Sequence, residues 1–230
     1  MAKKVKSTSR GKKIIAGTLV TAAIAASAGW WVIGKNKVPV SSYVATVVVD
    51  GDTFVTKEDQ IIRLTSINAP EMERCGGKEA QKELERIISG KPLYLKVLFR
   101  DIYNRLVADV FTPEGSVSEK MLTSGWVYYY RGTSGESDQM MALGELSREA
   151  KLGIYSQKCT QTKNQDHPEC VIKANNALGS GNKQYHFPGC GQYVNTSVQL
   201  YMGDAWFCTE AEAKKAGYTK GADCFDKKWR

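Results

Sequence analysis

The central part of the chain alternates short apolar runs with polar turns, which is the pattern of β-strands in a sheet. The runs are rich in valine, isoleucine and aromatic residues, and these residue types favour strands. We expect strands at residues 43–49, 54–57, 61–67, 93–99 and 105–111. Tight turns separate them, such as Asp50-Gly51-Asp52 after the first strand and Pro113-Glu114-Gly115 after the last.

Three segments instead repeat apolar residues at the spacing of one helix face. We expect helices at residues 78–89, 117–125 and 137–152. The first would bury Ala80, Leu84, Ile87 and Ile88. The last would bury Met140, Met141, Leu143, Leu146 and Ala150. Gly90 and Gly125 end the first two, since glycine commonly follows the last residue of a helix.

The order of these elements predicts an α+β fold that is mainly β. Five strands with a helix between the third and the fourth are typical of a small, partly open barrel of the OB type. We therefore expect a five-stranded OB-fold barrel with three helices over residues 43–159.

The composition changes after Cys159. Residues 160–169 are polar and contain His167-Pro168, which indicates a linker. Residues 170–230 hold four of the six cysteines and predict a small cysteine-rich module at the C-terminus. Within it, Thr209 and Glu212 have the spacing of a capping box at the start of a helix.

The N-terminal segment has the composition of a membrane anchor. Residues 14–34 carry no charged side chain, and a helix of this length spans a hydrocarbon core of roughly 30 Å. Six basic residues precede it within residues 1–13, and residues 35–42 follow as a linker. The positive-inside rule predicts a transmembrane signal anchor, a cytoplasmic N-terminus and an extracellular remainder. The alternative is a secreted protein, because Ala26-Ser27-Ala28 resembles a signal-cleavage site.

The net charge of +8 does not indicate a nucleic-acid-binding surface. Residues 1–37 contain eight basic and no acidic side chains, so they account for all of it. Residues 38–160 carry 15 basic and 17 acidic side chains, and residues 161–230 carry 9 and 7. A function that involves nucleic acid must therefore rest on a specific site.

Three short segments concentrate polar and charged residues in a way that the fold does not require. The first is the turn at residues 50–53, between two apolar strands. In the second, residues 63–71, an arginine interrupts an apolar strand and a glutamate follows a proline. The third is the turn at residues 101–105. Each segment by itself is most often a plain turn or a salt-bridged arginine.

The first two segments contain the donors of a hard metal ion. Asp52, Asn68 and a backbone carbonyl near Ala69 all offer oxygen. Oxygen donors suit Ca²⁺ or Mg²⁺ better than Zn²⁺.

The same segments contain groups suited to phosphate chemistry. Arg63 and Arg105 could bind a phosphate and neutralise the charge that grows on a five-coordinate phosphorus. Glu71 could orient or deprotonate a water molecule.

Taken together, these segments resemble the staphylococcal nuclease (thermonuclease) family. The matching stretches are VVVDGDTFV, IIRLTSINAPE, RDIYNRLVADVF and REAKLGIYSQ, in this order within about residues 43–159. The resemblance implies an OB-fold barrel and a calcium-dependent endonuclease. Such an enzyme hydrolyses phosphodiester bonds of DNA and RNA to 5′-hydroxyl and 3′-phosphate products.

The resemblance also implies roles for individual residues. The catalytic set is Arg63, Glu71 and Arg105, in which Glu71 activates water and the arginines stabilise the phosphorane. The metal set is Asp52, Asn68 and Ala69, with Asp50 as a second acid beside the metal. The aromatic residues expected around the nucleotide are Tyr103, Tyr128 and Tyr130.

One residue departs from the family pattern. Asn68 stands where the family has its second calcium carboxylate. An asparagine still offers a carbonyl oxygen, but it removes one negative charge. We therefore expect weaker binding of Ca²⁺ or a changed preference, with Mg²⁺ and Mn²⁺ as the alternatives.

The stretches GNKQYHFPGC and FCTEAEAKKAG resemble a small cysteine-rich module often found after such nuclease domains, and distantly a zinc-binding domain of a DNA-alkylation repair protein. Two chemistries compete there. A Zn²⁺ site could use His186, Cys190, Cys208 and Cys224. Disulfides are favoured, because the predicted location is oxidising. Cys75 and Cys159 could form one of them, and the other four cysteines would pair within the module.

Three functions agree with this sequence. The first is an extracellular endonuclease with DNA and RNA as substrates, anchored in the membrane through residues 14–34; we expect a monomer and infer no protein partner. The second is a non-catalytic module that binds nucleic acid or protein at the cell surface, as OB folds can do. The presence of Glu71 and both arginines argues against it, and Asn68 argues for it. The third is an accessory role in the cell wall or in competence, with the C-terminal module binding a partner.

Overall fold

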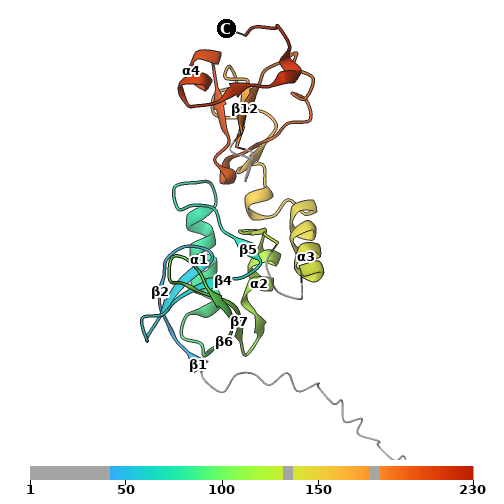
Figure 1. Cartoon of the computed structure of the whole chain (residues 1–230). Coiled ribbons are helices and arrows are strands. Elements are labelled where there is room, and N and C mark those ends of the chain that lie inside the picture. Colours follow the sequence, from blue (N-terminus) through green and yellow to red (C-terminus); the bar gives the residue numbers. More distant parts are fainter. Residues whose placement is uncertain (1–41, 132–136, 177–181, 230) are drawn as a thin grey trace, which may run out of the picture. The chain divides into compact units, whose positions relative to one another are not determined.

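The computed structural model describes residues 42–131, 137–176 and 182–229. Within these ranges, one apolar core lies in a β-barrel with helices, and a second lies in a small sheet of the cysteine-rich region (Figure 1). The predicted domain boundaries at residues 43–159, 160–169 and 170–230 stay predictions.

The barrel is one sheet whose two ends meet in the same chain segment. Its strands are β1 (Ser42–Tyr43), β2 (Ala45–Val48), β3 (Thr53–Thr56), β4 (Ile61–Leu64), β6 (Leu93–Arg100), β7 (Leu106–Thr112) and β8 (Gly115–Ser116). Hydrogen-bonded neighbours run in the order β1-β6-β7-β4-β3-β2, with β8 beside β7. Only Val44 separates β1 from β2, so this path begins and ends in one extended segment and the barrel is nearly closed.

This topology agrees with the predicted OB fold and confirms the mainly β class. β4 and β7 are parallel, and the other neighbouring strands are antiparallel. The strand number differs from the predicted five, because the first strand is interrupted at Val44 and the short β8 is added. Residues 61–67 are also not one strand. Ser66 has a φ of 64°, which ends β4 and redirects the chain into β5 (Ile67–Asn68), the partner of β9 (Tyr128–Tyr129).

The three predicted helices are confirmed. They are α1 (Gly77–Ile88), α2 (Val117–Ser124) and α3 (Ser137–Glu149), and a 3₁₀ helix, η1 (Gly153–Tyr155), follows them. α1 buries the four apolar residues expected of it in the barrel core. α2 begins at Ser116, whose side chain accepts a hydrogen bond from the Glu119 amide, and ends at Gly125 with a φ of 75°.

The predicted apolar face of α3 is only partly correct, because Met140 is buried in the core and Leu143 packs against it, whereas the other three residues are exposed. Met141 and Leu146 are 42% and 60% exposed, and Ala150 is exposed as well. Gly144 and Ser147, which the pattern did not predict, complete the buried side together with Met140 and the partly buried Leu143. Gly144 lets the helix approach Tyr129 closely, and the Ser147 hydroxyl donates to the Leu122 carbonyl of α2 at 2.6 Å. The two small residues at the contact, Gly144 and Ser147, thus replace Leu146 and Ala150 in the face that the helix presents to its neighbours.

The cysteine-rich region has a four-stranded sheet in the order β14-β11-β12-β15. Its elements are β10 (Thr160–Gln161), β11 (Ile172–Asn176), β12 (Lys183–His186), β13 (Val198–Gln199), η2 (Leu200–Met202), β14 (Ala205–Phe207), α4 (Glu210–Lys215), β15 (Thr219–Lys220) and η3 (Ala222–Cys224). The predicted capping box is confirmed, because the Thr209 side chain accepts from the Glu212 amide while the Glu212 carboxylate accepts from the Thr209 amide. β10 pairs with β13 in a separate two-stranded sheet.

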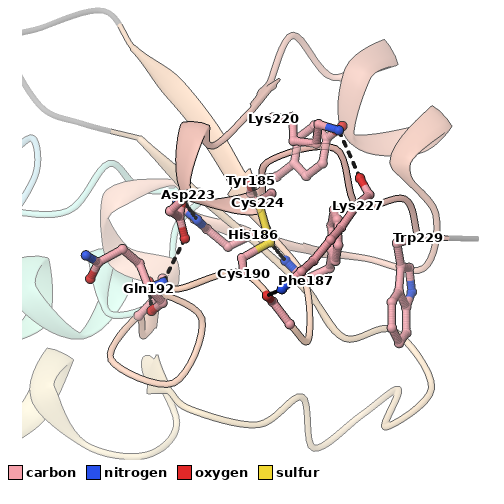
Figure 2. Close-up of a disulfide and its surroundings, with 12 residues drawn as sticks. Tyr185, His186, Phe187, Cys190, Gln192, Lys220, Asp223, Cys224, Lys227 and Trp229 are labelled. Carbon is pink, nitrogen blue, oxygen red and sulfur yellow. Dashed lines mark hydrogen bonds and ion pairs between the residues drawn. A yellow bond between two sulfur atoms is a disulfide. The ribbon is translucent and has the colours of Figure 1, made fainter.

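All six cysteines form disulfides, which confirms the expectation that they pair. The bonds are Cys75–Cys159, Cys170–Cys208 and Cys190–Cys224. Figure 2 shows the last of them in the core of the cysteine-rich region, where the Phe187 ring stacks on Trp229 with centroids 5.9 Å apart. The Cys170–Cys208 and Cys190–Cys224 disulfides thus supplement the small apolar core of the cysteine-rich region.

The predicted membrane localisation needs correction. Residues 14–34, where the sequence predicts a transmembrane anchor, lie outside the residues that the structure describes. Among those it does describe, no helix combines the length and the apolar character needed to cross a membrane. The part of the chain that the structure describes therefore gives no support to the predicted membrane-anchored localisation, and we do not propose that localisation again.

Candidate active site

Asp52 is the buried centre of the candidate site. It follows the turn between β2 and β3, where the Asp50 side chain accepts a hydrogen bond from the Asp52 amide at 2.9 Å. Gly51 makes this turn fit, because a Cβ at this position would lie 2.4 Å from the Cβ of Ala80 and 2.8 Å from that of Ala69. The glycine thereby seats the turn against α1 and the end of β5.

The Asp52 carboxylate is held by three neighbours. Its Oδ1 accepts from the Thr53 hydroxyl at 2.9 Å and lies 2.6 Å from Arg63 Nη1, although the latter contact is an ion pair without hydrogen-bond alignment. Its Oδ2 accepts from the Ala69 amide at 2.7 Å. Burial raises the pKa of Asp52 to about 6, aided by Asp50 and opposed by Arg63. Burial is the larger effect because the side chain is only 9% exposed.

Arg63 joins Asp52 to Asn68. It lies on β4, opposite Thr53 of β3, and its other terminal nitrogen, Nη2, donates to the side-chain oxygen of Asn68. The guanidinium therefore touches the side-chain oxygens of both residues that the sequence predicts as metal ligands. Its fork geometry suits two acceptors in one plane.

Asn68 is fixed at both ends of its amide. Its Oδ1 accepts from Arg63, and its Nδ2 donates to the Tyr128 hydroxyl at 3.4 Å. Asn68 and Tyr128 lie opposite each other in the antiparallel β5–β9 pair. Burial raises the pKa of Tyr128, so its hydroxyl stays protonated at neutral pH.

Glu71 is exposed just beyond this cluster. Its carboxylate has no hydrogen bond or ion pair with any residue in the described ranges, so it is open to water. Its backbone is fixed, since its carbonyl accepts from the Arg74 amide at 2.9 Å and Gly77 packs directly against it. The backbone of Glu71 is therefore held in place, while its carboxylate is exposed to solvent and could accept a proton.

Arg105 is held at the start of β7 by Asp101. Asp101 accepts from the Arg105 amide at 2.9 Å and from its Nε at 2.8 Å. Burial by itself would raise the pKa of Asp101, but the hydrogen bonds from Arg105 outweigh it and hold this pKa below its usual range. The Arg105 guanidinium also lies 5.3 Å from the Tyr103 ring centroid.

The two arginines share one face of the barrel wall. In the parallel β4–β7 pair, Arg63 lies opposite Val107. Side chains alternate along a strand, so Arg105, two residues before Val107, is directed to the same face as Arg63. The pairing of β4 and β7, which links distant parts of the sequence, brings both cations to one surface.

The other predicted substrate residues are more exposed. Tyr103 and Tyr130 are 71% and 59% exposed, whereas Tyr128 is half-buried. Exposed rings such as these, with Tyr103 beside Arg105, could stack on bases or sugars.

The donor chemistry around Asp52 fits a hard divalent cation. The side chains of Asp52 and Asn68 would each bind a cation through oxygen, and one oxygen of each contacts Arg63. Ala69 touches Asp52 through its amide rather than through the carbonyl that the sequence suggested. Asp50 contributes by fixing the turn. A cation on these oxygens would compete with the Arg63 guanidinium.

The alternative zinc ligands of the cysteine-rich region are differently arranged. Cys190 and Cys224 are bonded to each other, and Cys208 is bonded to Cys170. His186 lies beside the first pair, with its Nδ1 3.0 Å from Asp223 Oδ1 (Figure 2). Cysteines in disulfides offer no thiolate to a metal.

Sequence reasoning missed two residues that touch the site from outside the motifs. Tyr201 of η2 packs on Tyr128, with ring centroids 5.9 Å apart. Arg74, in the turn after Glu71, lies against Gly203. Neither belongs to a motif, and only the tertiary contacts reveal them.

Comparison with known proteins gives a consistent picture. The sequence profile of the family described as "Staphylococcal nuclease homologue" matches residues 61–157. An "Uncharacterized endonuclease" of Escherichia coli is 30% identical over 115 residues, which cover 47% of this chain and 73% of that protein.

Two plant relatives match a smaller share of their own length. The "Staphylococcal-like nuclease CAN1" of Arabidopsis thaliana is 30% identical over 129 residues, or 53% of this chain and 40% of the plant protein. An "Uncharacterized 38.1 kDa protein" of Capnoides sempervirens is 33% identical over 95 residues, which cover 41% of this chain and 28% of that protein. This chain thus spans less than half the length of either plant protein.

Proposed function

This chain belongs to the staphylococcal nuclease homologue family, and on that premise we propose that it is a metal-dependent endonuclease that hydrolyses phosphodiester bonds of DNA and RNA. One observation carries the proposal. Arg63 joins Asp52 to Asn68, and Arg105 is directed to the same face of the barrel. This arrangement supports a site in which Arg63 lies beside the oxygen donors and Arg105 approaches a phosphate from the same face, as phosphate chemistry requires.

The metal would be held by Asp52 and Asn68, with Ca²⁺ as the first candidate and Mg²⁺ or Mn²⁺ as alternatives. When bound, it would supply positive charge to polarise the phosphate. The charge of this oxygen set is low, because Asn68 is neutral. We therefore propose weak binding that needs a high concentration of the cation.

The chain's own residues supply the remaining steps. Glu71 accepts a proton from a water molecule, whose oxygen then bonds to phosphorus. Arg63 and Arg105 donate hydrogen bonds to the phosphoryl oxygens as negative charge grows on them in the five-coordinate transition state. The bond from phosphorus to the 5′ oxygen then breaks and that oxygen takes up a proton from solvent, leaving a 5′-hydroxyl and a 3′-phosphate. Tyr103, Tyr128 and Tyr130 contact the nucleotide next to the scissile bond.

The test is cleavage of single-stranded DNA and of RNA by the purified chain, with Ca²⁺, Mg²⁺, Mn²⁺ or EDTA. We expect cleavage that needs a cation and stops in EDTA. Glu71→Gln and Arg105→Ala should each lower the rate by about 10²-fold or more. Glu73→Gln is the matched control, because Glu73 is an exposed acid in the same turn. Metal-independent cleavage, or normal rates in the first two variants, would contradict the proposal.

Two observations favour a second function, a non-catalytic module that binds nucleic acid. Asn68 removes a metal carboxylate, and Arg63 occupies the oxygens that a cation would use. In that case the wild-type chain should bind single-stranded DNA in a filter or anisotropy assay and leave it uncut under every cation.

A further inference from the structure

Tyr201 belongs to the cysteine-rich region but packs with aromatic residues of the barrel region. It lies in η2 and is only 5% exposed. Its ring centroid is 5.9 Å from that of Tyr128 and 5.9 Å from that of Tyr155. Tyr201 is thus a buried residue whose ring packs against that of Tyr128.

Tyr128 connects this packing to the candidate metal oxygens. Its hydroxyl accepts from Asn68 Nδ2 at 3.4 Å, while Asn68 Oδ1 is turned to Arg63. An asparagine side chain has a donor end and an acceptor end of nearly equal size. The partner on the Nδ2 end therefore acts together with Arg63 to keep the oxygen directed toward the guanidinium. If Tyr128 shifts, the amide loses one of the two contacts that fix its orientation, and its oxygen is held less firmly for the cation.

The segment that carries Tyr201 is tied to the other flank of the site as well. The Leu200 amide donates to the Cys159 carbonyl at 2.8 Å, and Cys159 is bonded to Cys75 in the turn that begins at Glu71. In the same turn, the Arg74 guanidinium lies beside Gly203, where a Cβ would be 3.1 Å from its central carbon. Residues 198–204 therefore contact both the Tyr128 side and the Glu71 side of the site.

We propose that residues 198–204 are a positioning element of the nuclease site, and that Tyr201 is the positioning residue that fixes the Asn68 amide through Tyr128. This inference rests on the proposed function. It means that the cysteine-rich region influences how the site in the barrel binds its cation. Loss of the Tyr201 ring leaves room for Tyr128 to move, so the cation requirement should change more than the affinity for DNA.

The experiment measures cleavage of single-stranded DNA over a series of Ca²⁺ concentrations, with the full chain in its disulfide-bonded form. Tyr201→Ala should raise the Ca²⁺ concentration for half-maximal rate about fivefold, the effect of losing one ordinary hydrogen bond. The KM for DNA at saturating Ca²⁺ should change less. Tyr201→Phe keeps the ring and should behave as the wild type. Trp229→Ala is the control, because Trp229 is an aromatic residue of the same region that packs on Phe187 instead.

A second variant covers the case in which Tyr201→Ala does not fold. Tyr128→Phe keeps the ring and removes only the hydroxyl, so it should raise the Ca²⁺ requirement to a similar extent. An unchanged requirement in both Tyr128→Phe and any folded Tyr201→Ala would overturn the proposal, as would an equal shift in Trp229→Ala.

Hydrogen–deuterium exchange separates this inference from the proposed function. Tyr201→Ala should speed amide exchange in residues 66–76, far away in sequence, and Trp229→Ala should not. If the wild type cuts no nucleic acid, the proposed nuclease function fails, while faster exchange at residues 66–76 still supports positioning. Unchanged exchange there, whatever the activity, shows that Tyr201 does not position the site.

Discussion

Arg63 Nη1 lies 2.6 Å from Asp52 Oδ1, and Nη2 of the same guanidinium donates to the side-chain oxygen of Asn68. One arginine thus contacts both oxygens that the proposed function assigns to a cation. Opposite charges at this separation attract, while a cation beside an arginine is repelled. Cation binding and phosphate binding at this site should therefore be coupled through Arg63.

Removal of Arg63 should affect cleavage and cation binding in opposite directions. Arg63→Ala should lower the cleavage rate by about 10²-fold or more, because a phosphate-binding charge is lost. The same change should tighten Ca²⁺ binding, measured by isothermal titration calorimetry without DNA, because the competing charge is gone. Arg86→Ala is the control, since Arg86 is exposed on α1 and pairs with Glu83. Weaker Ca²⁺ binding in Arg63→Ala would show that the cation does not use the Asp52 and Asn68 oxygens.

Asn68→Asp should restore a second carboxylate to the oxygen set. We expect tighter Ca²⁺ binding, by about tenfold, because a negative charge replaces a neutral amide at the cation. The half-saturating Ca²⁺ concentration for DNA cleavage should fall accordingly. An unchanged half-saturation, with the protein folded, would remove Asn68 from the metal set.

The pH dependence of Ca²⁺ binding should follow Asp52. Burial raises the pKa of Asp52 to about 6 from the ordinary 3.8. Because the pKa of Asp52 is higher in the folded protein than in the unfolded chain, protonated Asp52 stabilises the fold fully below pH 3.8. This contribution is lost as the pH rises through about 6. Ca²⁺ needs the ionised form, so its binding should weaken up to tenfold per pH unit below about 6.

Thermal unfolding with and without Ca²⁺ checks this expectation. The increase in Tm on adding Ca²⁺ should be present at pH 7.5, small at pH 5 and absent in Asp52→Asn at both values. A Ca²⁺ effect of equal size at pH 5 and pH 7.5 would contradict the assignment to Asp52.

The Cys75–Cys159 disulfide should stabilise the barrel region strongly, because it joins residues 84 positions apart. In the chain-entropy estimate, a loop of this length contributes about 4.5 kcal/mol to the free energy of unfolding. The double variant Cys75→Ser/Cys159→Ser should lower that free energy in urea unfolding. It should also lower the cleavage rate, because Cys75 belongs to the turn that begins at Glu71. Cys170→Ser/Cys208→Ser is the control for cleavage, and an equal loss of activity there would argue for a general effect on folding.

The sequence was sufficient where local periodicity decides the structure. Apolar spacing correctly predicted α1 with its buried Leu84 and Ile87, and the capping box correctly predicted the start of α4 at Thr209. Spacing was only partly correct for α3, where it found Met140 and Leu143 but not Gly144 and Ser147, because small residues carry no signal in an apolar pattern.

Contacts between distant residues could not be read from the chain in the same way. The motifs suggested Asp52, Arg63 and Asn68, but not that one guanidinium would join the other two residues. Tyr201 lies 73 positions after Tyr128 and in no motif, so only folding reveals that their rings touch. The two disulfides of the cysteine-rich region could not be assigned either, because four cysteines allow three pairings.

The Cys75–Cys159 bond turns the main chain between these residues into a covalent ring that holds both Arg105 and Tyr128. A protease that cuts one peptide bond anywhere from residue 76 to 158 would therefore release no fragment. The nicked molecule would keep its mass, apart from one added water, until a reductant opened the ring.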